Sequence, residues 1–235
     1  MKSLSSDERK LVIIQGFYFF AASLAGIFVT VFFFAHGDLK TATLYNIAFF
    51  ASMTFFYGLS GLTLRYFSSG TLLKLSLVAR ALFYLLLFFL KENSIMYVIP
   101  LGILSGLSGG NFWAAYNLNQ YILTHSASRV SYFGWAAAIF HLTSALGPVI
   151  GGLIIAFIDR SNLGISNGYL VLFLLVALIN VLTVFIIGKL PSHGIPHFSY
   201  HHIWEHQRTK NWKLVLGQQG LLGLYDVAIG TVTGI

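Results

Sequence analysis

Two ionisable residues lie deep inside long apolar runs of the chain, Asp226 and Arg80. An ionised side chain at the centre of a membrane helix costs about 2.5–3.5 kcal/mol on insertion scales, so such residues usually face a partner or a wet cavity. Asp226 shares a helix face with Gln219, which predicts a cavity site for a cation or a cationic group of a substrate. For Arg80 three roles stay open: extension toward the membrane surface, pairing within the protein, or contact with a substrate.

Uncharged polar residues form a stripe along the apolar run 95–121. On an ideal helix they fall within about 80° of one another; they are Ser105, Ser108, Tyr116 and Asn119. The stripe predicts a cavity-lining face, and hydrogen bonding between helices is the alternative. Gln15 and Tyr18 form a similar face in the first apolar run. His141, in the fifth run, is interpreted as a packed hydrogen-bond partner, with proton relay as the alternative.

The composition predicts lipid as the solvent for most of the chain. Of 235 residues, 57% are hydrophobic and 9% are charged, whereas soluble domains have about 25% charged residues. The chain has no cysteine, which excludes disulfides and thiolate metal sites. We therefore expect an all-α integral membrane protein embedded in a bilayer.

Seven apolar runs are long enough to cross a bilayer, which takes roughly 20 helical residues. They are Leu11–Ala35, Thr41–Leu64, Leu72–Leu90, Ile95–Tyr121, Ser131–Ile158, Gly168–Ile187 and Leu214–Ile235. These runs predict a six-helix bundle over residues 1–188, a linker over 189–213, and the first helix of a second, incomplete bundle over 214–235. Because the seventh run ends without a polar flank, we expect the native protein to continue past Ile235.

Lysines and arginines predict the orientation. With a cytoplasmic N-terminus, the segments on the cytoplasmic side hold ten of these residues and the external loops hold three. Positive residues accumulate on the cytoplasmic side of membrane proteins. The same distribution accounts for the net charge of +7 without a nucleic-acid partner. A multi-pass protein of the cell membrane is expected.

The stretch SALGPVIGGLI, residues 144–154, combines a proline and three glycines inside an apolar run. Gly147 and Gly151 lie one turn apart, and Gly152 widens the smooth face that they form. In lipid, small residues let helix backbones approach closely, and Pro148 bends the helix. A tightly packed seam is expected, with a static seam and a seam along which two bundles slide as the two alternatives.

GPVIGG resembles the G-P-x-x-G-G signature in the fifth helix of many major facilitator superfamily transporters. A six-helix repeat that begins again at the seventh run also fits this superfamily. At one constant offset, Gln15, Gly16 and Gly26 align with Gln219, Gly220 and Gly230. Two further stretches resemble a bacterial branch of this superfamily: GGNFWAAYNLNQY in the fourth run and NWKLVLGQQGLLGL at the entry to the seventh run. The resemblance implies a twelve-helix fold of two six-helix bundles, a substrate path lined by helices one, four and seven, and a peripheral helix three.

Two family patterns differ in this chain. The loop between the second and third runs usually carries G-x-x-x-D-R-x-G-R-R, and here Arg65 matches the arginine while Leu64 stands in place of the aspartate. Lys74 is a candidate substitute for the later basic pair. The early helix-four arginine of proton-coupled drug antiporters is absent between Ile95 and Tyr121, so proton-coupled drug export is not supported.

The expected function is secondary active transport of a small solute by alternating access, with a proton or cation as a candidate coupling ion. A seven-helix receptor or sensor is the alternative, although its N-terminus is usually external. We find no phosphate-binding loop, nucleophile elbow or paired catalytic carboxylates, so neither an enzyme nor a cofactor is expected. His202 and His206 have a metal-ligand spacing, but a surface-lying amphipathic segment is preferred there and no metal site is expected.

Overall fold

The structure is a computed structural model that describes residues 4–163, 165–188 and 190–193. Within these ranges the chain is helical and contains no strand. Its elements are α1 (Ser6–His36), α2 (Leu39–Tyr66), α3 (Ser69–Leu90), η1 (Lys91–Tyr97), α4 (Val98–Leu123), α5 (Arg129–Ile158), η2 (Asp159–Leu163) and α6 (Ile165–Ile187). The first six predicted runs correspond to these six α-helices, and the seventh run lies outside the described residues.

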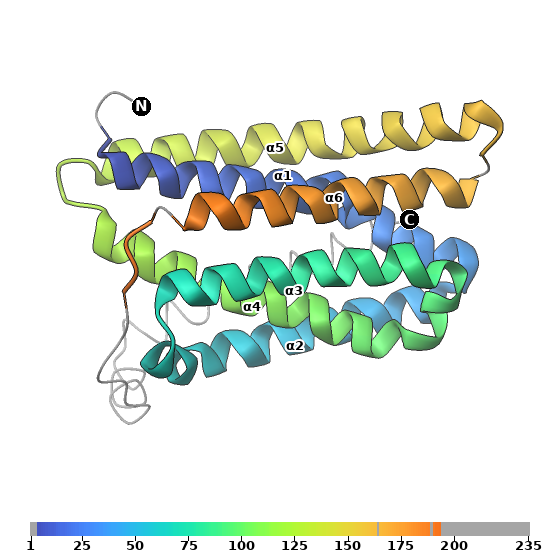
Figure 1. Cartoon of the computed structure of the whole chain (residues 1–235), viewed down its shortest axis with the longest axis horizontal. Helices are drawn as coiled ribbons and strands as arrows, with labels where there is room; N and C mark the ends of the chain where they lie inside the picture. The colour runs from blue at the N-terminus through green and yellow to red at the C-terminus, as the bar shows by residue number, and fades with distance from the viewer. Residues whose placement is uncertain (1–3, 164, 189, 194–235) are drawn as a thin grey trace, which may run out of the picture. The chain divides into compact units, whose positions relative to one another are not determined.

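Five helical segments of the described part are long and apolar enough to cross a membrane. One of them, Ser69–Leu123, comprises α3, η1 and α4. Figure 1 shows that the chain reverses at η1, so α3 and α4 run side by side in opposite directions. The prediction of an all-helical chain compatible with a membrane protein is confirmed.

Local signals set the helix starts. The Ser5 side chain accepts from the Glu8 backbone N–H, and Glu8 accepts from the Ser5 backbone in return, which satisfies two amides that the helix itself leaves unpaired. Asp38 caps α2 in the same manner by accepting from Thr41 N at 2.7 Å. Since these caps depend only on neighbouring residues, the polar residues before α1 and α2 carry their own start signals, whereas α4 and α5 begin without a side-chain cap.

The helices pair in a regular pattern. The most extensive contacts are those of α2 with α4, of α1 with α5 and of α3 with α6. The chain therefore divides into two triplets, α1–α3 and α4–α6, and the first helix of each triplet packs on the second helix of the other (Figure 1).

One end of the bundle gathers the chain start, the α2–α3 and α4–α5 loops and residues 190–193. We call it the N-terminal end. The Ser128 hydroxyl of the α4–α5 loop donates to Glu8 of α1, and Ser69 N donates to His193 O at 2.6 Å. Helix packing thus extends past Gly188 into the first residues of the predicted linker, where Leu190 is buried.

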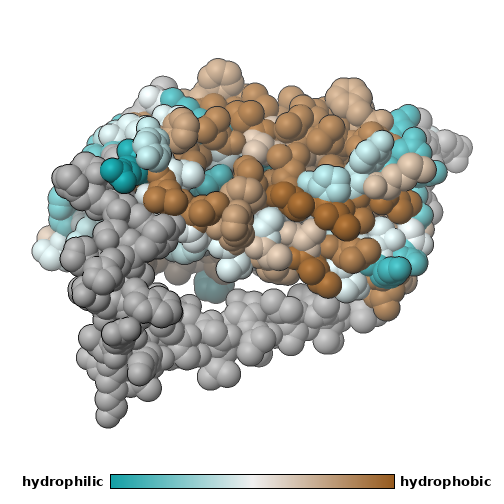
Figure 2. All heavy atoms as spheres, turned by 90° about the horizontal axis from the view of Figure 1, so that it is seen from below, coloured by the Kyte–Doolittle hydropathy of each residue, from teal (hydrophilic) through white to brown (hydrophobic). Residues whose placement is uncertain are grey.

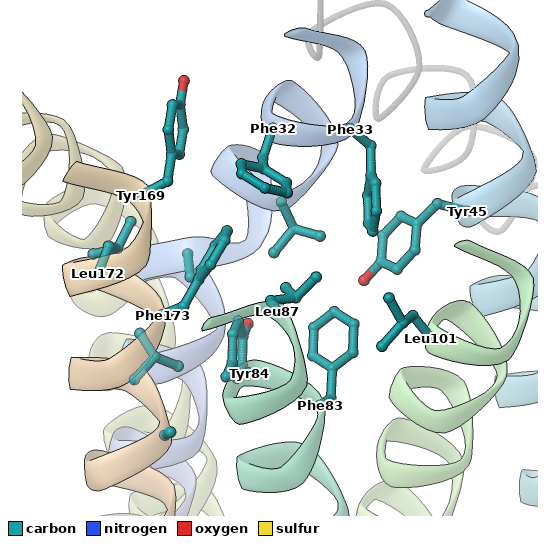
Figure 3. Packing of buried hydrophobic residues seen from close by; sticks show 14 of the residues in the cluster. Phe32, Phe33, Tyr45, Phe83, Tyr84, Leu87, Leu101, Tyr169, Leu172 and Phe173 are labelled. Carbon is teal, nitrogen blue, oxygen red and sulfur yellow. The ribbon is translucent and has the colours of Figure 1, made fainter. Parts of the chain in front are cut away.

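Two apolar clusters fill the interior. The cluster farther from the N-terminal end contains Phe32, Phe33, Tyr45, Tyr84 and Phe173 among others (Figure 3). The second cluster, toward the N-terminal end, is built mainly from α1, α3, α4 and α5. On the face seen in Figure 2, hydrophobic residues dominate the middle and hydrophilic ones gather mostly toward the two ends, as expected for helices that cross a bilayer.

Candidate functional site

A row of glycines on α4 lies directly against α2. A Cβ atom added at Gly102 would be 2.9 Å from Tyr45 O, and one added at Gly110 would be 2.5 Å from Met53 O. At Gly106, between them, an added Cβ would meet the Ser52 hydroxyl and Phe49 O. The two backbones approach so closely because these positions have no side chain. We call this contact the α2–α4 seam.

The sequence carries a signal for this seam in the spacing of its glycines. Gly102, Gly106 and Gly110 recur every four residues within GILSGLSGG, which places them on one face of a helix. The spacing matches that of Gly147 and Gly151 in the fifth run.

The glycines of α5 form the matching contact with α1. An added Cβ at Gly147 would meet Ser23, and one at Gly151 would meet Leu24 O and the Phe28 ring. Gly152 is in ordinary contact, 3.6 Å from Phe28. We call this contact the α1–α5 seam; the static and sliding alternatives for it remain predictions.

Pro148 lies inside α5, beside this seam. A proline leaves the carbonyl four residues earlier without its helical partner. For Pro148 this carbonyl belongs to Ser144. At the residue before it, the Ser23 hydroxyl of α1 donates to Thr143 O at 2.8 Å. The neighbouring helix thus supplies a hydrogen bond to the α5 backbone just before the proline.

A cavity of about 300 Å³ opens beside the α2–α4 seam. Its lining residues are Met53, Thr54, Tyr57, Trp113 and Asn117. Asn117 Nδ2 donates to the Tyr57 hydroxyl at 3.3 Å, and both side chains are exposed. Aromatic walls with a few polar groups are typical of small-molecule sites. Met53 lies halfway along α2, so the cavity is near the middle of the bundle.

The predicted helix-four stripe lies inside the bundle instead of lining this cavity. Ser108 donates to Ser76 O at 2.8 Å, and Asn119 Oδ1 accepts from the Ser69 hydroxyl at 2.8 Å. Ser105 accepts from Tyr45 at 3.4 Å. These contacts are the hydrogen bonds between helices that were the alternative interpretation. A role for the stripe in a substrate path stays a prediction.

Two further predicted residues meet in one hydrogen-bonded group. The Tyr116 hydroxyl donates to Gln15 Oε1 at 2.6 Å and also lies 2.6 Å from the Tyr132 hydroxyl. Gln15 Nε2 donates to Ala136 O at 3.4 Å. The group joins α1, α4 and α5, and all three side chains are buried.

Within the described residues Arg80 forms no ion pair, and its side chain lies against an aromatic ring. Its guanidinium carbon lies 4.4 Å from the centre of the Tyr18 ring. Tyr18 is itself buried, which places this predicted cavity residue in the bundle interior.

The remaining predicted residues lie apart from the cavity. His141 is exposed on α5 next to the Phe140 ring. Arg65 is exposed and lies over the Tyr66 ring, 5.9 Å from its centre. Asp226 and Gln219 lie outside the described residues.

Comparison with known proteins shows similarity without an assigned activity. The chain matches no family model. It is 26% identical over 177 residues to an uncharacterized protein in the sodM 3' region of Geobacillus stearothermophilus, covering 75% of this chain and 80% of that protein. It is 23% identical over 221 residues to the uncharacterized protein YqgE of Bacillus subtilis (strain 168), covering 92% of this chain. The matched segment is 50% of YqgE, so the chain spans about half the length of that relative.

Proposed function

We propose that the chain forms one helical bundle of a secondary active transporter of a small solute, of the major facilitator type. The observation that carries this proposal is the exchanged pairing of the two helix triplets. The first helix of each triplet is held by a glycine seam to the second helix of the other. Many transporters are built from such three-helix repeats in opposite orientations.

The direction of the helices supports the same proposal. α1 leaves the N-terminal end of the bundle, whereas α4 returns to it (Figure 1). The two triplets therefore cross the bundle in opposite senses, as inverted repeats require.

Alternating access further needs a second bundle. YqgE is similar to this chain over half of its own length, which leaves room in that relative for another bundle of comparable size. The predicted restart at Leu214–Ile235 fits the same arrangement.

The cavity beside the α2–α4 seam is the proposed solute site. Transporter sites lie near the bilayer midplane, where two repeats meet. Met53, Thr54 and Tyr57 bring this cavity to the middle of α2. Trp113 offers a ring for stacking, and Asn117 offers an amide for hydrogen bonds.

Cysteine accessibility tests the proposal without knowledge of the solute, because the chain has no cysteine of its own. Asn117→Cys should react with a membrane-impermeant maleimide added to either side of a sealed membrane, as the site opens alternately to each. Leu178→Cys is the matched control, since Leu178 is exposed on α6 at a position expected to face lipid. A protein whose Asn117→Cys reacts from neither side lacks the proposed water-filled path.

A further inference from the structure

Arg80 is a cation without a carboxylate partner in the described part of the chain. It lies midway along α3. The carboxylates that the structure describes all lie within or next to the end turns of helices; they are Asp7, Glu8, Asp38, Glu92 and Asp159. A charge midway along an apolar membrane helix is normally paired or hydrogen-bonded, because even partial desolvation is otherwise uncompensated. Within the described residues, no carboxylate offsets the charge of Arg80.

The guanidinium is held in the interior by an aromatic stack. It covers one face of the Tyr18 ring, with 4.4 Å from Cζ to the ring centre. The other face of Tyr18 lies on Phe112, with ring centres 3.4 Å apart and planes 3° apart. A cation over an aromatic face is attracted by the ring electrons. This contact orients the guanidinium but leaves its charge unneutralised.

Hydroxyl groups from several helices surround the same level of the bundle. Tyr84 and Ser76 lie one helical turn on either side of Arg80 along α3, and Tyr84 and Tyr18 are hydrogen-bond neighbours of the guanidinium. Tyr45 of α2, which is hydrogen-bonded to Ser105 of α4, also lies close enough to interact electrostatically with the Arg80 guanidinium. Arg80 thus lies where the two apolar clusters meet, with the Tyr18 and Tyr84 hydroxyls beside its guanidinium.

We propose that Arg80 is the binding group for an anionic moiety, a carboxylate or a phosphate, of the small solute. The guanidinium presents a planar fork of N–H donors that matches both oxyanions. Arg80 is only partly buried and does not line the α2–α4 cavity, so the proposed anion contact is a second point of the solute path, separate from that cavity. This inference rests on the proposed transport function and adds the charge class of the solute.

Ligand-induced stabilisation of the purified protein in detergent tests the inference. The probes are two matched pairs, benzoate against benzamide and glycerol 3-phosphate against glycerol, with sodium chloride holding ionic strength constant. A ligand that binds only the folded state raises the Tm. We expect benzoate, glycerol 3-phosphate or both to raise it, and their uncharged partners not to. Which anion acts distinguishes a carboxylate from a phosphate site.

Three variants assign the effect to Arg80. Arg80→Gln should weaken the apparent affinity for the active anion about tenfold to a hundredfold, the range for a hydrogen bond to a charged group. Arg80→Lys keeps the positive charge but loses the planar set of N–H donors, so its affinity should lie between those of the wild type and Arg80→Gln. It also tests the inference if Arg80→Gln does not fold. Lys74→Gln removes a positive charge from the same helix and should bind as the wild type does.

Three outcomes would overturn the inference: a wild-type protein that responds to neither anion, equal responses to benzoate and benzamide, or unchanged affinity in Arg80→Gln. None of them touches the transport proposal, which is tested separately by the two-sided reactivity of Asn117→Cys. Two-sided reactivity together with any of the three would leave a transporter whose solute does not bind Arg80.

Discussion

The Tyr116 hydroxyl donates to Gln15 Oε1 at 2.6 Å and so joins α4 to α1 inside the bundle. The same oxygen lies 2.6 Å from the Tyr132 hydroxyl of α5. Three helices that are distant in sequence thus share one buried polar group. Together with the stacked rings of Tyr18 and Phe112, this hydrogen bond links the first helices of the two triplets.

Removal of that link should destabilise the bundle in a non-additive way. Tyr116→Phe and Gln15→Leu should each cost about 0.6–2 kcal/mol, the range for hydrogen bonds between membrane helices. The double variant should cost less than the sum, because the second substitution removes a group whose partner is already lost. Unfolding of purified protein in detergent measures all three variants, and strict additivity would contradict a direct bond.

The α2–α4 seam should not tolerate even one methyl group. Gly106→Ala would place Cβ against the Ser52 hydroxyl and the α2 backbone, and overpacking typically costs about 1–3 kcal/mol. Gly134→Ala is the control, since nothing lies within 4 Å of an added Cβ there and alanine favours a helix. Thermal unfolding should separate the two variants, and an unchanged Tm for Gly106→Ala would mean that the seam is looser.

The start of α3 should depend on Ser192. Gly70 N donates to the Ser192 hydroxyl at 3.2 Å, and that hydroxyl donates to Ser68 Oγ at 2.6 Å. A Cβ at Gly70 would lie 2.7 Å from Ser192 Oγ but 3.3 Å from Ser192 Cβ. Gly70→Ala should therefore lower the Tm, and adding Ser192→Ala should cause little further loss because the clashing oxygen is gone. A double variant that loses the full sum of the single effects would contradict this arrangement.

Orientation in the membrane is a prediction that single cysteines can test. Ser6, Lys40, Asn93 and Ser126 are exposed, and they alternate between the two ends of the bundle. A membrane-impermeant maleimide should label Lys40→Cys and Asn93→Cys in intact cells, and Ser6→Cys and Ser126→Cys only after permeabilisation. The reverse pattern would place the N-terminus outside, against the positive-inside rule.

Asp226 remains the sequence-based candidate for ion coupling. If it binds a coupling cation, Asp226→Asn should abolish gradient-driven accumulation in proteoliposomes while leaving abundance unchanged. Asparagine keeps the shape and much of the hydrogen bonding but removes the charge. Accumulation at the wild-type level in this variant would exclude Asp226 from coupling.

The sequence alone was sufficient for the number and extent of the first six helices. The predicted run Thr41–Leu64 corresponds to α2 over Leu39–Tyr66, and the other five runs agree similarly with their helices. The reason is that length, apolar composition and end caps are local properties of a membrane helix. The four-residue glycine spacing of the α1–α5 and α2–α4 seams is an equally local property of the sequence.

Only the tertiary structure decided which way each helix face points. Periodicity grouped Ser105, Ser108, Tyr116 and Asn119 on one face, but hydrophobicity could not orient that face, because lipid and protein interior are both apolar. The structure turned the stripe toward α1, α2 and α3 and left Trp113 and Asn117 at the cavity. The partner of Arg80 was likewise not predictable from the sequence. Its contact with Tyr18 joins residues 62 positions apart in the chain, and only helix packing brings them together.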